Sequence, residues 1–276
     1  MKNLAGKIAV VTGAGSGIGR AIAHSLAKAG TNIVAADLRL DTAEAVSEEV
    51  RALGVEAIAV ETDVASHESV STLADAAYDR FGKVDILVNN AGVSWRPLRP
   101  ITQARLSDWK FLIDINLWGV IHGLDVFLPR MSAQPGEKHV VNTSSLAGVW
   151  PVKGHTPYSA TKAAVTAISE GMAMELADEG FGVTILQPAM TRTNVIQNSE
   201  ALRSDTDKGE GRSFKPMVDE RMEGLVAGYI DADVVGEMVR DAIQRNQLYL
   251  HTHAISADHI KARVEMIYGD DTYGRA

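Results

Sequence analysis

The segment Thr12-Gly13-Ala14-Gly15-Ser16-Gly17-Ile18-Gly19 is the clearest indication of the fold of this chain. It follows a short apolar run, residues 7–12, and opens a segment of helical periodicity, residues 18–29. Glycine allows the backbone to turn sharply and a ligand to approach it closely. The start of a helix offers unpaired N–H groups and a positive dipole end. The stretch therefore predicts a strand, a phosphate-binding loop and a helix.

The same alternation of strand and helix continues along the chain. Further apolar runs predict strands at 31–37, 55–62, 84–90, 138–144, 182–187 and 247–251, and amphipathic segments predict helices at 42–53, 69–81, 109–131 and 157–177. Apolar runs without polar alternation are typical of a sheet that is buried on both faces. We therefore expect an α/β fold, a doubly wound parallel sheet of about seven strands with helices on both faces.

No linker rich in Pro, Gly or Ser divides the chain, so we expect one domain over residues 1–276. Two segments interrupt the alternation. The charged segment at about 191–228 is weakly periodic, and we expect it to form a lid over the substrate. We expect residues from about 252 to 276 to form a C-terminal extension with a last helix at 255–268.

Composition excludes several classes of site and partner. The chain has no cysteine, which excludes disulfides, zinc–thiolate sites, iron–sulfur clusters and cysteine nucleophiles. Its net charge of −8 argues against a nucleic-acid partner. No run approaches the roughly 20 apolar residues of a membrane helix, and the N-terminus does not resemble a signal peptide. We therefore expect a cytoplasmic protein that binds neither nucleic acid nor a membrane. His251 and His253 lack an evident third ligand, so no metal is expected.

Asp37 ends the second predicted strand. In a dinucleotide-binding fold a carboxylate there accepts hydrogen bonds from the adenosine ribose and repels a 2′-phosphate. Ser16 in the loop and Leu38 after the acid are not basic, which favours NAD. Arg39 keeps NADP open as the less favoured cofactor. The alternative role for Asp37 is a helix N-cap.

Six motifs in order resemble the single-domain branch of the short-chain dehydrogenase/reductase family, whose fold is of the Rossmann type. They are Thr12-Gly13-x-x-x-Gly17-x-Gly19, Asn89-Asn90-Ala91-Gly92, Asn116, Ser145, Tyr158-x-x-x-Lys162 and Pro188 to Thr193. The resemblance runs from about residue 6 to about residue 195. Two positions depart from the family's pattern, because Ala189 replaces its usual glycine and Thr191 a usual aliphatic residue.

The resemblance implies a catalytic set of Asn116, Ser145, Tyr158 and Lys162. Tyr158 and Lys162 are four residues apart, so a helix places them on one face. A nearby ammonium favours the phenolate, and the tyrosine can then take a proton from an alcohol while hydride leaves the same carbon. Ser145 is expected to hydrogen-bond the substrate oxygen. By resemblance alone, Asn116 holds a water that links Lys162 to solvent. Ser144 competes for the serine role, but Ser145 has the family's spacing of thirteen residues from the tyrosine.

The expected cofactor and substrate contacts follow from the same motifs. Asp63 is expected at the adenine by resemblance, with a cap as its alternative role. The full predicted cofactor set is Gly13, Ser16, Gly17, Ile18, Gly19, Asp37, Asp63, Val64, Asn90, Gly92, Tyr158, Lys162, Pro188, Thr191 and Thr193. The predicted substrate contacts are Ser145, Trp95, Leu146, Trp150, His155 and Met190. This second set is largely apolar, which favours a lipophilic substrate.

The sequence thus predicts an NAD(H)-dependent oxidoreductase that interconverts a secondary alcohol and a ketone, on an aromatic, alicyclic or steroid-like substrate. Two alternatives stay open: an NADPH-dependent ketone reductase, and a dinucleotide-binding regulator without turnover. By resemblance, the helices at 109–131 and 157–177 form a subunit interface. We therefore expect a homo-oligomer, either a dimer or a tetramer.

Overall fold

The computed structural model describes residues 1–94, 98–203 and 228–269. These residues form a seven-stranded parallel sheet with the strand order β3-β2-β1-β4-β5-β6-β9. The strands are β1 (Ile8–Thr12), β2 (Asn32–Asp37), β3 (Ala57–Glu61), β4 (Ile86–Asn89), β5 (Lys138–Thr143), β6 (Phe181–Gln187) and β9 (Tyr249–His251). The chain moves outward from β1 to β3 and then returns to β4, so the winding reverses between β1 and β4. The predicted doubly wound α/β fold is confirmed.

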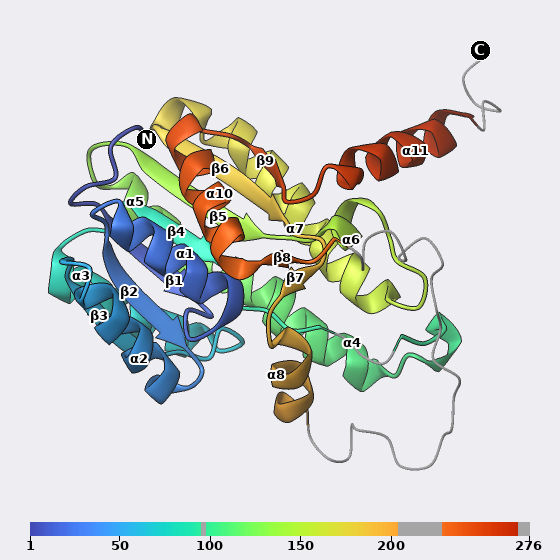
Figure 1. Cartoon of the computed structure of the whole chain (residues 1–276), viewed down its shortest axis with the longest axis horizontal. Coiled ribbons are helices and arrows are strands. Elements are labelled where there is room, and N and C mark those ends of the chain that lie inside the picture. Colours follow the sequence, from blue (N-terminus) through green and yellow to red (C-terminus); the bar gives the residue numbers. More distant parts are fainter. Residues whose placement is uncertain (95–97, 204–227, 270–276) are drawn as a thin grey trace.

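Helices cover both faces of the sheet (Figure 1). One face carries α1 (Gly17–Lys28), α2 (Leu40–Arg51) and α10 (Ala232–Arg245). The other face carries α3 (His67–Phe81), α5 (Gly119–Ser132) and α7 (Thr156–Glu175). Each layer buries its own apolar cluster, with Ile22 and Val239 in the first and Phe127 and Val165 in the second. Burial on both faces explains why the strand sequences are continuously apolar.

The remaining elements connect the strands and main helices, most of them at the carboxyl ends of the strands, whereas η3 precedes the amino end of β6. They are η1 (Ile101–Gln103), α4 (Leu106–Ile113), the π-helical turn η2 (Asp114–Trp118), α6 (Leu146–Val149), η3 (Ala177–Glu179), the β7 (Thr191–Arg192) and β8 (Ile230–Asp231) pair, α8 (Val195–Leu202) and α11 (Ile255–Gly269). In Figure 1, α11 projects away from the sheet and its helical layers. Most of the predicted lid, residues 204–227, lies outside the described residues.

Helix α10 was not predicted from the sequence. Val235, Val239 and Ile243 recur every four residues along it and are fully buried, so the signal was present. The helix packs closely on α1, since a Cβ on Gly236 would lie 2.3 Å from the carbonyl oxygen of Ala21. A second difference concerns the helix predicted at 109–131, which begins at Leu106 and contains the η2 turn.

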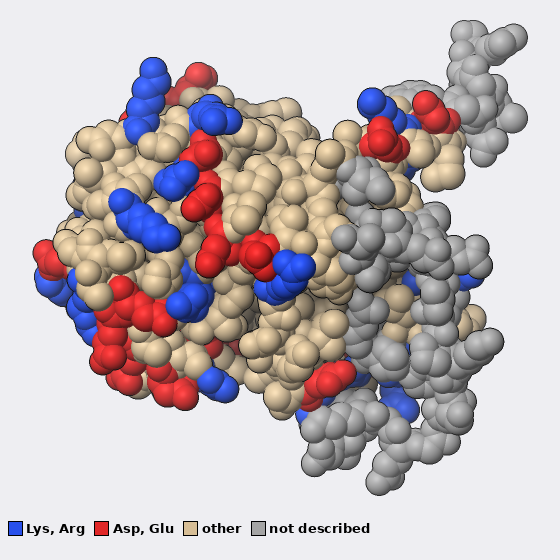
Figure 2. All heavy atoms as spheres, in the orientation of Figure 1, with Lys and Arg blue, Asp and Glu red and all other residues tan. Residues whose placement is uncertain are grey.

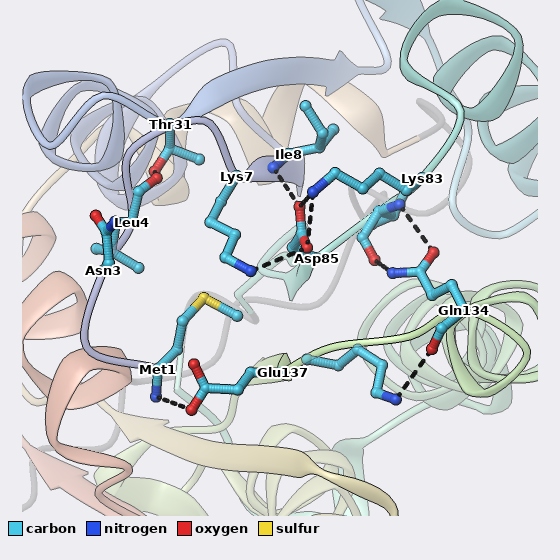
Figure 3. A network of polar contacts seen from close by, with 12 residues as sticks. Met1, Asn3, Leu4, Lys7, Ile8, Thr31, Lys83, Asp85, Gln134 and Glu137 are labelled. Carbon is cyan, nitrogen blue, oxygen red and sulfur yellow. Dashed lines mark hydrogen bonds and ion pairs between the residues drawn. The ribbon is translucent and has the colours of Figure 1, made fainter.

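A polar network ties the amino ends of β1 and β4 together (Figure 3). The carboxylate of Asp85 accepts a hydrogen bond from the backbone N–H of Ile8 at 2.9 Å and pairs with Lys7 at 3.3 Å and Lys83 at 3.0 Å. The side chain of Asp85 is only 3% exposed. Nearby, the side-chain amide of Gln134 donates to the carbonyl oxygen of Val84 at 2.6 Å. This network lies at the end of the sheet opposite the carboxyl ends, on the two strands where the winding reverses.

The helical run Leu106–Ser132, made of α4, η2 and α5, is long and apolar enough to cross a membrane by length and composition alone, and the sequence prediction had not singled it out. Length and composition are weak evidence for a membrane span, because the core helix of a soluble protein passes the same test. In this fold the run packs through Val120, Leu124 and Phe127 into the core. On the face of the molecule in Figure 2, acidic and basic side chains are interspersed.

Candidate active site

A cleft of about 610 Å³ lies at the carboxyl ends of the strands, where the winding reverses. This is the place where open parallel sheets bind ligands. The cleft brings together the glycine loop, the end of β2 and the loops that follow β3 to β6. Predicted site residues on its wall are Gly13, Ser16, Gly17, Ile18, Asp37, Asp63, Val64, Asn90, Gly92, Ser145, Tyr158, Lys162, Pro188, Thr191 and Thr193.

The glycine loop has the shape that a phosphate-binding loop requires. Gly13 and Gly17 have positive φ angles of 64° and 53°, which side-chain-bearing residues rarely adopt. A Cβ on Gly19 would lie 2.1 Å from the carbonyl oxygen of Gly13, so the loop closes tightly on α1. Ser16 is the N-cap residue of α1, but its side chain makes no capping hydrogen bond. These features fit the pyrophosphate of a dinucleotide.

Asp37 contacts this loop directly. Its Oδ2 accepts a hydrogen bond from the N–H of Gly15 at 2.9 Å, and its Oδ1 accepts one from the N–H of Arg39 at 3.2 Å. Arg39, and not Asp37, is the N-cap residue of α2. The Arg39 side chain is two-thirds exposed and lies 3.4 Å from Asp41. The carboxylate of Asp37 is therefore fixed at the edge of the cleft.

Lys162 and Tyr158 lie in the first turns of α7. Lys162 is buried, and its Nζ donates a hydrogen bond to the carbonyl oxygen of Thr143 at 2.8 Å. The same Nζ lies 5.9 Å from the centre of the Tyr158 ring. Burial lowers the pKa of Lys162 from its ordinary value of 10.5 to about 8. The arrangement places a buried basic group next to the tyrosine at the cleft wall.

Ser144 and Ser145 differ in their contacts. The hydroxyl of Ser144 is buried and donates a hydrogen bond to the carbonyl oxygen of Lys162 at 2.8 Å. The Oγ of Ser145 accepts a hydrogen bond from the N–H of Ala147 at 3.1 Å and approaches the carbonyl oxygen of Pro188 at 3.4 Å. Both serines border the cleft. Since Ser144 is engaged with α7, the geometry favours Ser145 as the serine that faces a substrate.

Asn116 lies in the π-helical turn η2, a type of distortion that is frequent at functional sites. Its side-chain amide is buried and binds both polar backbone groups of Val93, at 2.8 and 2.9 Å. Gly92 lies between Asn116 and Lys162. A Cβ there would be 3.0 Å from Asn116 Oδ1 and 3.5 Å from Lys162 Nζ. Asn116 therefore anchors the loop after β4 beside the lysine, and the water relay stays a prediction.

The predicted substrate residues are distributed differently. Leu146 and Trp150 are buried and pack with Met190 in a small apolar cluster beside the cleft. Trp150 also stacks on His259 of α11, with ring centres 3.8 Å apart. His155 is buried and stacks on Tyr158. Among the described residues, none of these side chains lines the cleft itself. Trp95 lies outside the described residues.

The segment predicted as a lid, at about 191–228, contains α8, although none of the helix's cleft residues was predicted individually. They are Val195, Asn198, Ala201 and Leu202, and the N-cap residue Asn194 lines the cleft with them. Asn198 Nδ2 donates a hydrogen bond to the hydroxyl of Ser16 at 3.3 Å, and the N–H of Ser94 donates one to the hydroxyl of Ser199 at 2.8 Å. These contacts join α8 to the glycine loop and to the loop after β4. Apolar spacing in this charged segment is weak, so the sequence carried little signal for them.

Asp63 and His253 both contact backbone groups. Asp63 Oδ1 accepts a hydrogen bond from the N–H of Ala65 at 2.9 Å, while Ser66 caps α3. His253 Nε2 lies 2.7 Å from the carbonyl oxygen of Gly228. Within the part of the chain that the structure describes, no group of three or more metal-ligating side chains is positioned to hold a metal ion.

The buried amine predicts a pH-dependent stability difference for Lys162→Met. Between pH 8 and 10.5 the unfolded chain still holds the proton that folded Lys162 has released, so the unfolding free energy of the wild type rises with pH. Methionine has no such proton. The stability of the variant relative to the wild type should therefore fall by roughly 3 kcal/mol across this window. Urea unfolding of both proteins without cofactor, at pH 7.5 and 10, measures the difference. A difference independent of pH would contradict the buried, destabilised ammonium.

Comparisons with known proteins agree with this geometry. A family model described as short chain dehydrogenase matches residues 7–203. An uncharacterized oxidoreductase of Listeria monocytogenes is 34% identical over 229 residues, which are 82% of this chain and 90% of the relative. The glycine betaine reductase ATRR of Emericella nidulans is 38% identical over 207 residues, which are 75% of this chain but only 16% of that longer protein.

A solved structure extends the similarity to nearly the whole chain. The crystal structure of a short chain dehydrogenase/reductase from Burkholderia phymatum in complex with NAD has a TM-score of 0.88 and 34% sequence identity to this protein. It covers 97% of this chain, which in turn covers 96% of it. The chain is therefore an oxidoreductase of the short-chain dehydrogenase/reductase family, whose members bind a nicotinamide dinucleotide.

Proposed function

We propose that this protein is an NAD(H)-dependent oxidoreductase that interconverts a secondary alcohol and a ketone. The main support for this proposal is that the catalytic candidates and the dinucleotide-binding candidates line the same cleft. Tyr158, Lys162 and Ser145 lie on the wall of the same cleft as the glycine loop and Asp37. A proton-transfer group and a dinucleotide site thus share one cavity, as a reaction that moves a proton and a hydride together requires.

In this proposal the bound dinucleotide supplies the hydride acceptor, and the protein supplies orientation and proton transfer. The phenol oxygen of Tyr158 takes the proton of the alcohol as the general base. Lys162, in its charged form beside the ring, favours the phenolate. The hydroxyl of Ser145 donates a hydrogen bond to the substrate oxygen and stabilises its developing charge. In the reverse direction Tyr158 protonates the reduced ketone.

The position of Asp37 supports NAD over NADP. Its carboxylate is fixed by Gly15 at the cleft edge, where it repels a 2′-phosphate. Arg39 lines the same cleft and is the feature that favours the alternative, an NADPH-dependent ketone reductase. The structure related to this chain at 34% identity contains NAD, which agrees with the first assignment.

Apolar side chains on the substrate side support a lipophilic substrate. Val93 and Ile115 line the cleft, and the cluster of Leu146, Trp150 and Met190 lies beside it. We also propose a homo-oligomer. Exposed apolar side chains on α4, η2 and α7 support this, namely Leu106 (85% exposed), Trp118 (47%) and Met174 (77%).

The test is reduction of NAD⁺ and NADP⁺ by the purified protein with a panel of benzylic, alicyclic and steroid secondary alcohols. We expect turnover with NAD⁺. In Asp37→Ala the preference for NAD⁺ over NADP⁺ should fall at least tenfold in kcat/KM, because the repulsion of the 2′-phosphate is lost. Asp79→Ala, at an exposed position of α3 that does not line the cleft, is the matched control and should keep the wild-type ratio. An unchanged ratio in Asp37→Ala would remove the basis for the NAD assignment.

A further inference from the structure

We infer that His155 is a positioning residue that fixes the ring of Tyr158 for proton transfer; this inference rests on the proposed function. The two rings are stacked nearly parallel, with centres 4.4 Å apart and an interplanar angle of 11°. His155 is buried, at 7% exposure. The imidazole therefore covers one face of the phenol ring and leaves little room there for a change of its orientation.

The backbone holds His155 firmly in this place. Its N–H donates a hydrogen bond to the carbonyl oxygen of Val152 at 3.0 Å, and its carbonyl oxygen accepts one from the N–H of Ser159 at 2.9 Å. Gly154, the preceding residue, has a φ of 78° and accepts a hydrogen bond from the N–H of Arg99 at 3.0 Å. His155 is the N-cap residue of α7. The imidazole is thus placed by a tight turn joined to the same helix that carries Tyr158.

Other contacts of the phenol ring are consistent with a fixed orientation. Tyr158 packs against the apolar cluster of Val93 and Leu112, and the Nζ of Lys162 lies 5.9 Å from its ring centre. General-base catalysis needs the phenol oxygen within about 3 Å of the substrate oxygen. A misplacement of about 1 Å can reduce a rate a hundredfold. A flat ring stacked on the base therefore contributes by holding the base in position.

This role differs from direct substrate contact, which the sequence predicted for His155. Stacking needs a flat ring of suitable size and does not need the imidazole nitrogens. A substrate contact through those nitrogens would be lost in phenylalanine as much as in alanine. His155→Phe and His155→Ala therefore distinguish the two roles, and His155→Leu is the variant that fills the volume without a flat ring.

The kinetic experiment compares these variants with the wild type. We expect kcat to fall by roughly ten- to a hundredfold in His155→Ala and His155→Leu, with KM for NAD⁺ within about twofold of the wild type. His155→Phe should restore kcat to within about threefold, with an unchanged pH profile. If His155→Ala does not fold, His155→Leu takes its place. An unchanged kcat in both would overturn the inference, as would a phenylalanine variant as slow as alanine.

A second readout does not depend on turnover. In protein with ¹³C-labelled tyrosine rings, the Tyr158 signal is identified by its absence in Tyr158→Phe. The stacked ring at position 155 should change the NMR chemical shift of this signal in the wild type and in His155→Phe. This change should be absent in His155→Ala and His155→Leu. A Tyr158 signal that is the same in all four proteins would overturn the stacking. If no alcohol is oxidised but the signals behave as expected, the proposed function fails while the stacked geometry holds.

Discussion

Replacing Tyr158 with phenylalanine is expected to reduce kcat by roughly 10³-fold while NADH still binds. The substitution removes one oxygen, so the ring can keep its stack on His155 and its packing against Val93 and Leu112. What it removes is the proton acceptor at the wall of the cleft. General-base catalysis contributes about 10²–10⁴-fold, so the loss should fall within this range. Single-turnover reduction of NAD⁺, with NADH affinity measured by fluorescence, separates the chemical step from binding.

Tyr249→Phe is the matched control for this variant. Tyr249 donates its hydroxyl to Glu170 at 2.8 Å, and it does not line the cleft. Its kcat should match that of the wild type. Turnover by Tyr158→Phe within threefold of the wild type would show that another group moves the proton. If wild-type protein binds NADH but oxidises no alcohol in the panel, the regulator without turnover becomes the better hypothesis.

Replacing Gly19 with alanine is expected to weaken NADH binding by about a hundredfold. The new Cβ would lie 2.1 Å from the carbonyl oxygen of Gly13 and 2.6 Å from Asn90 Nδ2. The first contact is with backbone, so either α1 or the loop must move. Overpacking of this kind costs about 1–3 kcal/mol, and the upper end corresponds to a factor of about a hundred in a dissociation constant. Titration of tryptophan or NADH fluorescence measures the affinity directly.

Gly171→Ala provides the control for this second prediction. Gly171 lies inside α7, four residues before its last residue Glu175, and a Cβ there would meet nothing within 4 Å. Alanine should leave NADH binding unchanged and raise stability by about 0.5–1 kcal/mol, because glycine is unfavourable inside a helix. Wild-type affinity in Gly19→Ala would mean that the loop can absorb the extra methyl group.

The sheet was predictable because its signal is local. All seven strands were predicted from apolar runs, and the structure places each within a few residues of its predicted bounds. Gly30 and Gly54, at the ends of the first two helices, have φ angles of 84° and 92°. A parallel strand that is buried on both faces is visible in the sequence as five or six consecutive apolar residues. The end of a helix can be visible as a single glycine.

The candidate site was predictable where its residues follow a motif. Tyr158 and Lys162 are fixed by helical spacing, and the glycine loop by its position between strand and helix. Contacts between distant segments left no such pattern. The stack of Trp150 on His259 and the hydrogen bond from Asn198 to Ser16 join residues far apart in the chain. Their partners are set by how α11 and α8 pack, which no local window of sequence records.

The network around Asp85 also bears on how the protein folds. Asp85 binds the N–H of Ile8 from 77 residues away, and at the other end of the same two strands the N–H of Asn90 donates to the hydroxyl of Thr12 from 78 residues away. The pairing of β1 with β4 is therefore a contact of high sequence separation, which is slow to form. Two earlier α/β units must be synthesised before β1 can gain this neighbour. The dinucleotide cleft opens at this junction, so a fragment that ends before residue 85 lacks the parts of its wall that follow β4, β5 and β6.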